Sequence, residues 1–271
     1  MNILELSKDF IKSWKLFLSI LVVSFFISLL LSNTLTKSYT ASIKIYETKN
    51  SDLGMLQNLS FPSVNNLFSN FSETNENSRY AFQLFKSRDF MESFIENYGP
   101  DKLITGYLNE TTIKNSNNDE KISSAYSILV DNINVRPPSN QATYIRFSHR
   151  NQNIPHDLLN KLIEYTNSFI KEKHLRENQE SMDYLQSQFD SSNSVNVNKA
   201  FSKLYEEKLS KYIIIKSKEH YVFEILEYAR YQSKQTFPNQ TIFLILAFLF
   251  SIALNLIYLI LQKKKSIQDK T

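Results

Sequence analysis

The sequence contains no cysteine, three glycines and four histidines among its 271 residues. Without cysteine it has neither a thiol nucleophile nor a disulfide framework, so an exported domain of this chain does not rely on disulfides. The three glycines form no phosphate-binding loop, and no two histidines have the spacing of metal ligands. We therefore predict that the chain is not an enzyme and has no catalytic residue, cofactor or metal site.

The excess of positive charge is small, with a formal net charge of +4. Its clearest concentration is Lys263, Lys264 and Lys265, directly after the second of two long apolar runs. Lysines at the cytoplasmic end of a membrane span explain this cluster without nucleic acid. We therefore predict that the chain does not bind nucleic acid.

Two uncharged apolar runs lie near the ends of the chain. The first, Leu16–Leu31, has only serines as polar members, and the second, Ile242–Leu261, has only Ser251 and Asn255. A hydrocarbon core requires about 20 apolar helical residues. The second run meets this length, and the first does so when Trp14 and Leu35 are included. We predict transmembrane helices over residues 14–35 and 241–261.

The flanking lysines predict the topology. Lys8, Lys12 and Lys15 precede the first span, so residues 1–13 and the tail 262–271 are expected in the cytoplasm. Residues 36–240 are then expected outside it, in the periplasm or its extracytoplasmic equivalent. A cleaved signal peptide is the alternative for the first run, but the run is longer than a usual signal sequence and no Ala-x-Ala site follows it.

The first half of the intervening region contains three predicted strands and one helix. Residues 39–46 alternate in polarity as a strand does, and apolar residues repeat at helical spacing over 78–98. Residues 133–137 and 143–147 alternate again and are predicted to pair. We expect the polar stretches 47–77 and 109–118 to be largely irregular, and 122–129 to be a short helix or a strand entry.

A long helical hairpin is predicted over residues 155–218. Pro155 suits a first helical turn, and no helix breaker occurs before 190–193, so the helix should run for roughly 35 residues or 50 Å. Its middle, 171–181, has Leu175 as its only aliphatic residue. A second helix from about Asn198 is expected to return beside it, followed by a strand over 221–228. The fold class is α+β, with two transmembrane helices flanking a domain that has a small mixed sheet and this hairpin.

The order of these elements, together with several motifs, resembles the polysaccharide co-polymerases, the Wzz-type chain-length determinants. The supporting positions are Tyr39 and Ala41 in the first strand, Ser87 and Arg88 ending the first helix, Val135 and Pro137 in the next strand, Pro155 and Asn160 in the long helix, and Pro238 before the second span. The chain departs from the family in having almost no glycine near the second span.

This resemblance implies a non-enzymatic regulator of the chain length of a surface polysaccharide, such as O-antigen of lipopolysaccharide or an exopolysaccharide. It implies a bacterial inner-membrane protein that assembles as a ring-like homo-oligomer. Its other expected partners are a separate polymerase or export machinery, a lipid-linked glycan and membrane lipid. One alternative is a membrane adaptor or activator of a separately encoded tyrosine kinase in capsule or exopolysaccharide synthesis or export. Residues 262–271 contain no tyrosine and no fused kinase domain, but an adaptor could still work through this tail. An unrelated two-span sensor is another alternative.

Small or weakly polar residues recur every four positions in both spans, which places each set on one helix face. The sets are Ser24, Ser28 and Ser32 in the first span and Ala247, Ser251 and Asn255 in the second. Such faces are candidates for packing between the two spans or between subunits. Chance spacing remains the competing explanation.

Two further groups of residues are candidates with simpler alternatives. His149 and His156 are expected to be surface or structural histidines rather than ligands. Arg136, Arg146 and Arg150 are placed to touch an anionic glycan or lipid phosphate, or belong to a solvated sheet face.

Overall fold

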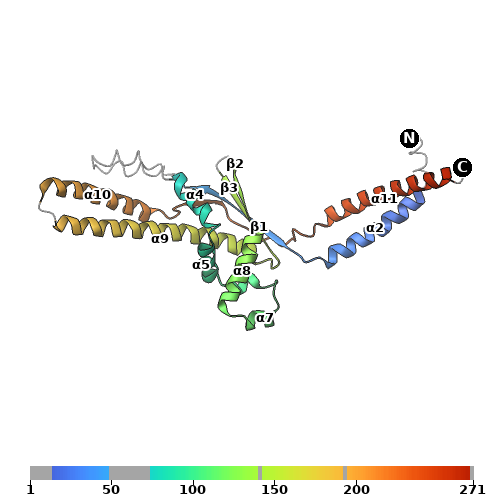
Figure 1. Cartoon of the computed structure of the whole chain (residues 1–271), viewed down its shortest axis with the longest axis horizontal. Coiled ribbons are helices and arrows are strands. Elements are labelled where there is room, and N and C mark those ends of the chain that lie inside the picture. The colour runs from blue at the N-terminus through green and yellow to red at the C-terminus, as the bar shows by residue number, and fades with distance from the viewer. Residues whose placement is uncertain (1–13, 49–73, 140–141, 192–193, 269–271) are drawn as a thin grey trace. The chain divides into compact units, whose positions relative to one another are not determined.

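The computed structural model describes residues 14–48, 74–139, 142–191 and 194–268. The chain divides into two compact units. The first combines Met1–Tyr39 with Lys234–Thr271, and the second is Thr40–Ser233. Figure 1 labels most of the helices and strands of both units.

The first unit is built on a pair of apolar helices, α2 (Trp14–Thr34) and α11 (Gln240–Gln268), which run alongside each other (Figure 1). The stretches Phe17–Thr34 and Gln240–Leu261 have mean hydropathies of 2.1 and 2.7 and are long and apolar enough to cross a membrane. A backbone hydrogen bond links the segment after α2 to the segment before α11: the Ser38 amide donates to the carbonyl of Phe237 at 2.9 Å.

The second unit contains most of a four-stranded sheet in the order β2-β3-β1-β4. The strands are β1 (Tyr39–Glu47), β2 (Ile133–Ser139), β3 (Ala142–His149) and β4 (Phe223–Glu227). The pairs β2–β3 and β1–β4 are antiparallel. The β1–β3 pair follows the same sense, since Thr40 bonds to Ser148 while Lys44 lies over Tyr144. The α+β class is confirmed, and the sheet is antiparallel rather than mixed.

The expected helix over residues 78–98 is two helices, α4 (Thr74–Leu84) and α5 (Arg88–Tyr98). The Ser87 amide closes a tight turn by donating to the carbonyl of Leu84, and Ser87 itself has an extended backbone. Ser87 thus occupies the N-cap position of α5, with Asp89 in the first turn. The Ser87 side chain makes no capping hydrogen bond, so the boundary follows from the extended backbone of Ser87, which apolar spacing alone does not show.

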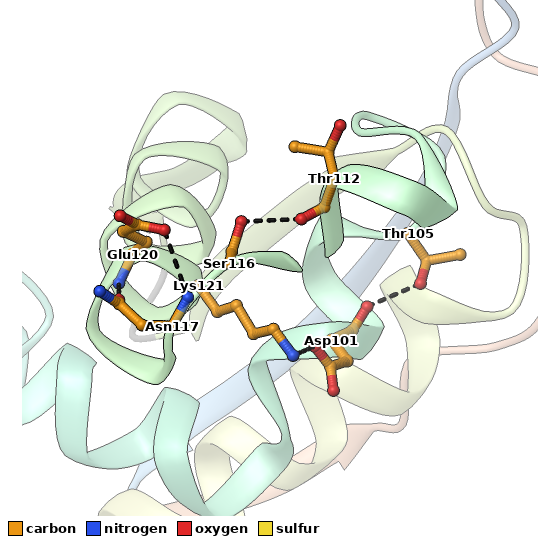
Figure 2. A network of polar contacts seen from close by, with 7 residues as sticks. All are labelled: Asp101, Thr105, Thr112, Ser116, Asn117, Glu120 and Lys121. Atoms are coloured by element: carbon orange, nitrogen blue, oxygen red, sulfur yellow. Dashed lines mark hydrogen bonds and ion pairs between the residues drawn. The ribbon is translucent and has the colours of Figure 1, made fainter. Parts of the chain in front are cut away.

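Three short helices continue from α5: α6 (Pro100–Ile104), α7 (Glu110–Asn115) and α8 (Asn118–Asn132). Residues 109–118, expected to be a loop, therefore contain a helical turn and a half, and 122–129 lies inside α8. Figure 2 shows how this region is held. Asn117 and Glu120 form a reciprocal capping box, and Lys121 pairs with Asp101 at 3.1 Å. The capping box begins α8, and the ion pair joins α8 to α6.

The hydrophobic core lies between one face of the sheet and helices α5, α8 and α9 (Ile154–Ser191). Phe94 and Ile145 are buried there, and Tyr165 packs on Phe94 with ring centroids 5.5 Å apart. Beyond this core, α9 continues alongside α10 (Val195–Ser217) as a hairpin (Figure 1). The 38 residues of α9 correspond to about 57 Å at 1.5 Å per residue.

Candidate functional site

The predicted packing residues of the two apolar helices lie at their mutual contact. The Ser24 hydroxyl is 3.3 Å from the backbone carbonyl of Ala247, and Ser28, Ser32, Ser251 and Asn255 are all buried although most of their helix neighbours are exposed. Small side chains allow two helix backbones to approach closely. The structure therefore brings these positions together within one chain, between α2 and α11.

Asn160 and Asn167, two helical turns apart on α9, bind the backbone of β4 and the segment after it. Asn160 accepts from the amide of Ala229 at 2.9 Å and donates to its carbonyl at 3.1 Å. Asn167 accepts from the amides of Val222 and Phe223 and donates to the carbonyl of Phe223 at 2.8 Å. We call these two side chains the asparagine clamp.

The clamp binds backbone groups at both ends of β4, namely Val222 and Phe223 at its start and Ala229 two residues after its end. Backbone donors and acceptors at a sheet edge are otherwise left unpaired. Asn160 is one of the positions on which the family resemblance rests, whereas Asn167 was not predicted. Asn167 could have been recognised from the sequence by its spacing of seven residues from Asn160, which places both side-chain amides on one helix face.

The other motif positions have identifiable structural settings. Ala41 is buried in β1, and Tyr39 begins that strand. Arg88 is the first residue of α5, and its guanidinium pairs with Glu92 at 2.7 Å. Val135 pairs with Ile145 across β2 and β3.

Two of the three prolines among the motif positions lie at or just before the start of a helix, and the third lies within a strand. Pro137 lies within β2, Pro155 is buried in the first turn of α9, and Pro238 follows a cis peptide bond just before α11. A proline in a first helical turn sacrifices no intrahelical hydrogen bond, because that amide has no partner within the helix. The setting of Pro155 thus agrees with its residue chemistry.

His149 is a fully buried structural residue. Its Nε2 lies 2.7 Å from the carbonyl of Leu103, and its Nδ1 accepts the amide of Asn151 at 2.9 Å. Burial lowers its pKa, and Arg150 acts in the same direction, while the two backbone contacts oppose it. His149 and His156 do not form a ligand pair with a carboxylate, because the described residues contain no cluster of three potential metal ligands.

The three arginines singled out in the sequence do not form one cluster of contacts. Arg150 donates to the carbonyl of Gly106 and lies 4.4 Å from the ring centre of Tyr107. Arg146 and Arg136 lie on β3 and β2, opposite Asn134 and Tyr144 respectively. Arg150 thus has a structural role at the end of β3, apart from the other two.

The hairpin has apolar side chains on two faces. One groove, of 540 Å³, is lined by Tyr184 and Leu204, which are 63% and 45% exposed. A second groove is lined by Phe189, Phe201 and Tyr205. Because successive helical residues turn by about 100°, Tyr184 and Gln186, which line different grooves, lie on opposite sides of the contact with α10.

The N-terminal third of the chain matches the model of a known protein family. Residues 1–98 match the model of the Wzz family, described as chain length determinant protein. This segment includes α2, β1, α4 and α5, and with them the motif residues Tyr39, Ala41, Ser87 and Arg88. No curated protein matches the sequence.

Solved structures of low sequence identity align with large parts of the chain. A full-length bacterial polysaccharide co-polymerase covers 99% of this chain and 99% of its own, at 10% identity and a TM-score of 0.47. A fragment of WzzB, a polysaccharide co-polymerase from Salmonella Typhimurium, covers 74% of this chain and 100% of its own, at 9% identity and a TM-score of 0.37. The match of residues 1–98 to the model of the Wzz chain length determinant family confirms the resemblance predicted from the sequence motifs.

Proposed function

We propose that this chain is a non-enzymatic regulator of chain length in the synthesis of a bacterial surface polysaccharide, acting from the inner membrane with a separate polymerase. The observation that carries the proposal is the match of residues 1–98 to the chain length determinant family. The two apolar helices support a membrane location. The lysines at 8, 12 and 15 and at 263–265 support a topology with both termini in the cytoplasm and residues 36–240 outside it.

The hairpin supports assembly into a homo-oligomer. Tyr184 and Leu204 are 63% and 45% exposed on one face, and Phe189 is 39% exposed on the other. A single apolar face favours a closed dimer, whereas two different faces allow each copy to contact one neighbour with each face. Such a head-to-tail contact closes into a ring when the rotation between copies permits it.

The function is tested with cells that lack this gene, complemented with the intact gene or an empty vector. Surface polysaccharide is separated on a gel and the distribution of chain lengths is measured. We expect the deletion to abolish the preferred length while synthesis continues, and the intact gene to restore it. An unchanged distribution would contradict the proposal and favour the role of a membrane adaptor.

The assembly is tested with Tyr184→Lys combined with Leu204→Lys, since two charges on one face should prevent its burial in a contact. Thr111→Lys, on an exposed position of α7, is the matched control. We expect the double variant to shift the detergent-solubilised protein to smaller species in native mass spectrometry and to lose the preferred chain length. An unaltered mass would contradict the use of this face for assembly.

A further inference from the structure

The long helix α9 begins at a corner that is built on His149. β3 ends at this residue, a turn follows, and α9 starts at Ile154. His149 is 0% exposed, although histidine is usually only partly buried in proteins. Both of its ring nitrogens face backbone groups, and these two contacts belong to different elements.

The contacts assign the protonation state of the ring. Nδ1 lies 2.9 Å from the amide nitrogen of Asn151, which has a proton to donate, so Nδ1 is the acceptor. The proton of the neutral ring is then on Nε2, which donates to the carbonyl of Leu103 at 2.7 Å. This tautomer satisfies both backbone groups, one at the end of α6 and one in the turn before α9.

Asn151 transmits the state of His149 to the start of α9. Its amide is held by His149, its carbonyl accepts the amide of Ile154 at 3.3 Å, and its side-chain oxygen accepts the amide of Asn153 at 3.0 Å. A second proton on His149 would occupy Nδ1 and face the Asn151 amide, donor against donor. The Asn151 amide would then lose its acceptor, and the turn that begins α9 would lose its anchor.

The surroundings disfavour the charged ring. Among the described residues, the charged and titratable groups that act on it are Arg150, whose positive charge opposes protonation, and Tyr107, whose ring stands edge-on with centroids 5.0 Å apart. Arg150 also donates to the carbonyl of Gly106, so the same corner is tied to the segment after α6 twice. The complete burial of His149 adds a desolvation cost for the charged form.

We propose that His149 is a proton-sensitive latch that fixes the first turn of α9 to α6 and opens in acid. Because folding lowers the pKa of His149, the unfolded or open state takes up the proton first as the pH falls. Above the ordinary histidine pKa the closed state therefore has its full stability. This stability decreases as the pH falls below that value, and it decreases no further below the lowered pKa of the closed state. The inference concerns the second unit alone and does not depend on the proposed function.

The test is hydrogen exchange of the full-length protein in detergent between pH 7.5 and 5, corrected for the intrinsic pH dependence of exchange. Between the ordinary histidine pKa and the lowered pKa of the closed state, we expect the protection of peptides covering 101–108 and 149–158 to fall about tenfold per pH unit. Residues 162–170 should stay protected. His156→Gln, a second histidine in the first turns of α9, is the control and should behave as the unaltered protein does.

His149→Asn separates the latch from general destabilisation. An asparagine oxygen can accept the amide two residues ahead, as the histidine Nδ1 does, but it does not titrate. We expect this variant to keep 149–158 protected equally at both pH values, and to expose 101–108 at both, since asparagine is too short to reach Leu103. An acid-induced loss of protection over 149–158 that persists in His149→Asn would overturn the proposal, as would unchanged protection in the unaltered protein.

Discussion

Replacing Asn167 with leucine tests the asparagine clamp at its most buried point. Asn167 is 5% exposed, and its side chain is the partner of two backbone amides and one carbonyl. Leucine has a similar volume but no polar atoms, so all three backbone groups would be left without this partner. At about 1 kcal/mol for each net hydrogen bond, and more for a group that stays buried and unpaired, we expect a loss of roughly 3–4 kcal/mol.

A loss of this size is a large part of the stability of an ordinary domain, which is about 5–15 kcal/mol. For a unit of this size, 1 kcal/mol lowers the midpoint of thermal unfolding by roughly 2–4 °C, so we expect a decrease of about 10 °C. The measurement is thermal unfolding of the detergent-solubilised protein, followed by circular dichroism. Local hydrogen exchange over 222–229 should increase in the same variant.

Asn178→Leu is the matched control, because it makes the same change on the same helix with a different set of lost contacts. Asn178 is also 5% exposed, but its amide nitrogen bonds only to the carbonyl of His174 in its own helix, and its side-chain oxygen is buried without a partner. Replacing it should be neutral or stabilising by about 1 kcal/mol. If both variants lowered the midpoint equally, the clamp would have no special contribution and the reasoning would be wrong.

Three further substitutions have defined outcomes. Asn160→Ala removes the reciprocal pair with Ala229, and we expect thermal unfolding to show a smaller loss than Asn167→Leu, about 1–2 kcal/mol, because this site is only partly buried. Ser251→Leu should overpack the contact between α2 and α11 at a cost of about 1–3 kcal/mol, visible as weaker cross-linking between cysteines introduced into the two helices of this cysteine-free chain. Tyr98→Phe loses the 3.0 Å bond to the carboxylate of Asp157, whose side chain is 37% exposed, and we expect the free energy of unfolding measured by chemical denaturation to fall by about 1 kcal/mol.

The asparagine clamp also illustrates how far a sequence motif can be interpreted. Asn160 was singled out by its place in the family pattern, but its role is to bind a residue 69 positions away. Asn167 has no such pattern and resembles any polar residue of a long helix. Only the folded chain, which brings β4 against α9, shows that both amides pair with backbone.

Local chemistry was sufficient for the features that repeat along the chain. Uncharged runs of the length of a bilayer predicted both apolar helices, alternation predicted the paired strands β2 and β3, and the absence of breakers predicted α9 as a helix of exceptional length. In each case neighbouring residues carry the signal, because the period of a helix or strand is short. The division of 78–98 into two helices was missed, since Ser87 interrupts the backbone without interrupting the apolar spacing.

By itself, therefore, the sequence determined two apolar helices, an α+β fold, a long hairpin and a resemblance to chain-length determinants. The tertiary structure decided the strand order β2-β3-β1-β4, the contact of Ser24 with Ala247 in one chain, and the burial of His149. These features depend on residues separated by tens to hundreds of positions. No periodicity within a segment encodes them, because they arise only when distant backbone and side-chain groups must satisfy each other in a shared core.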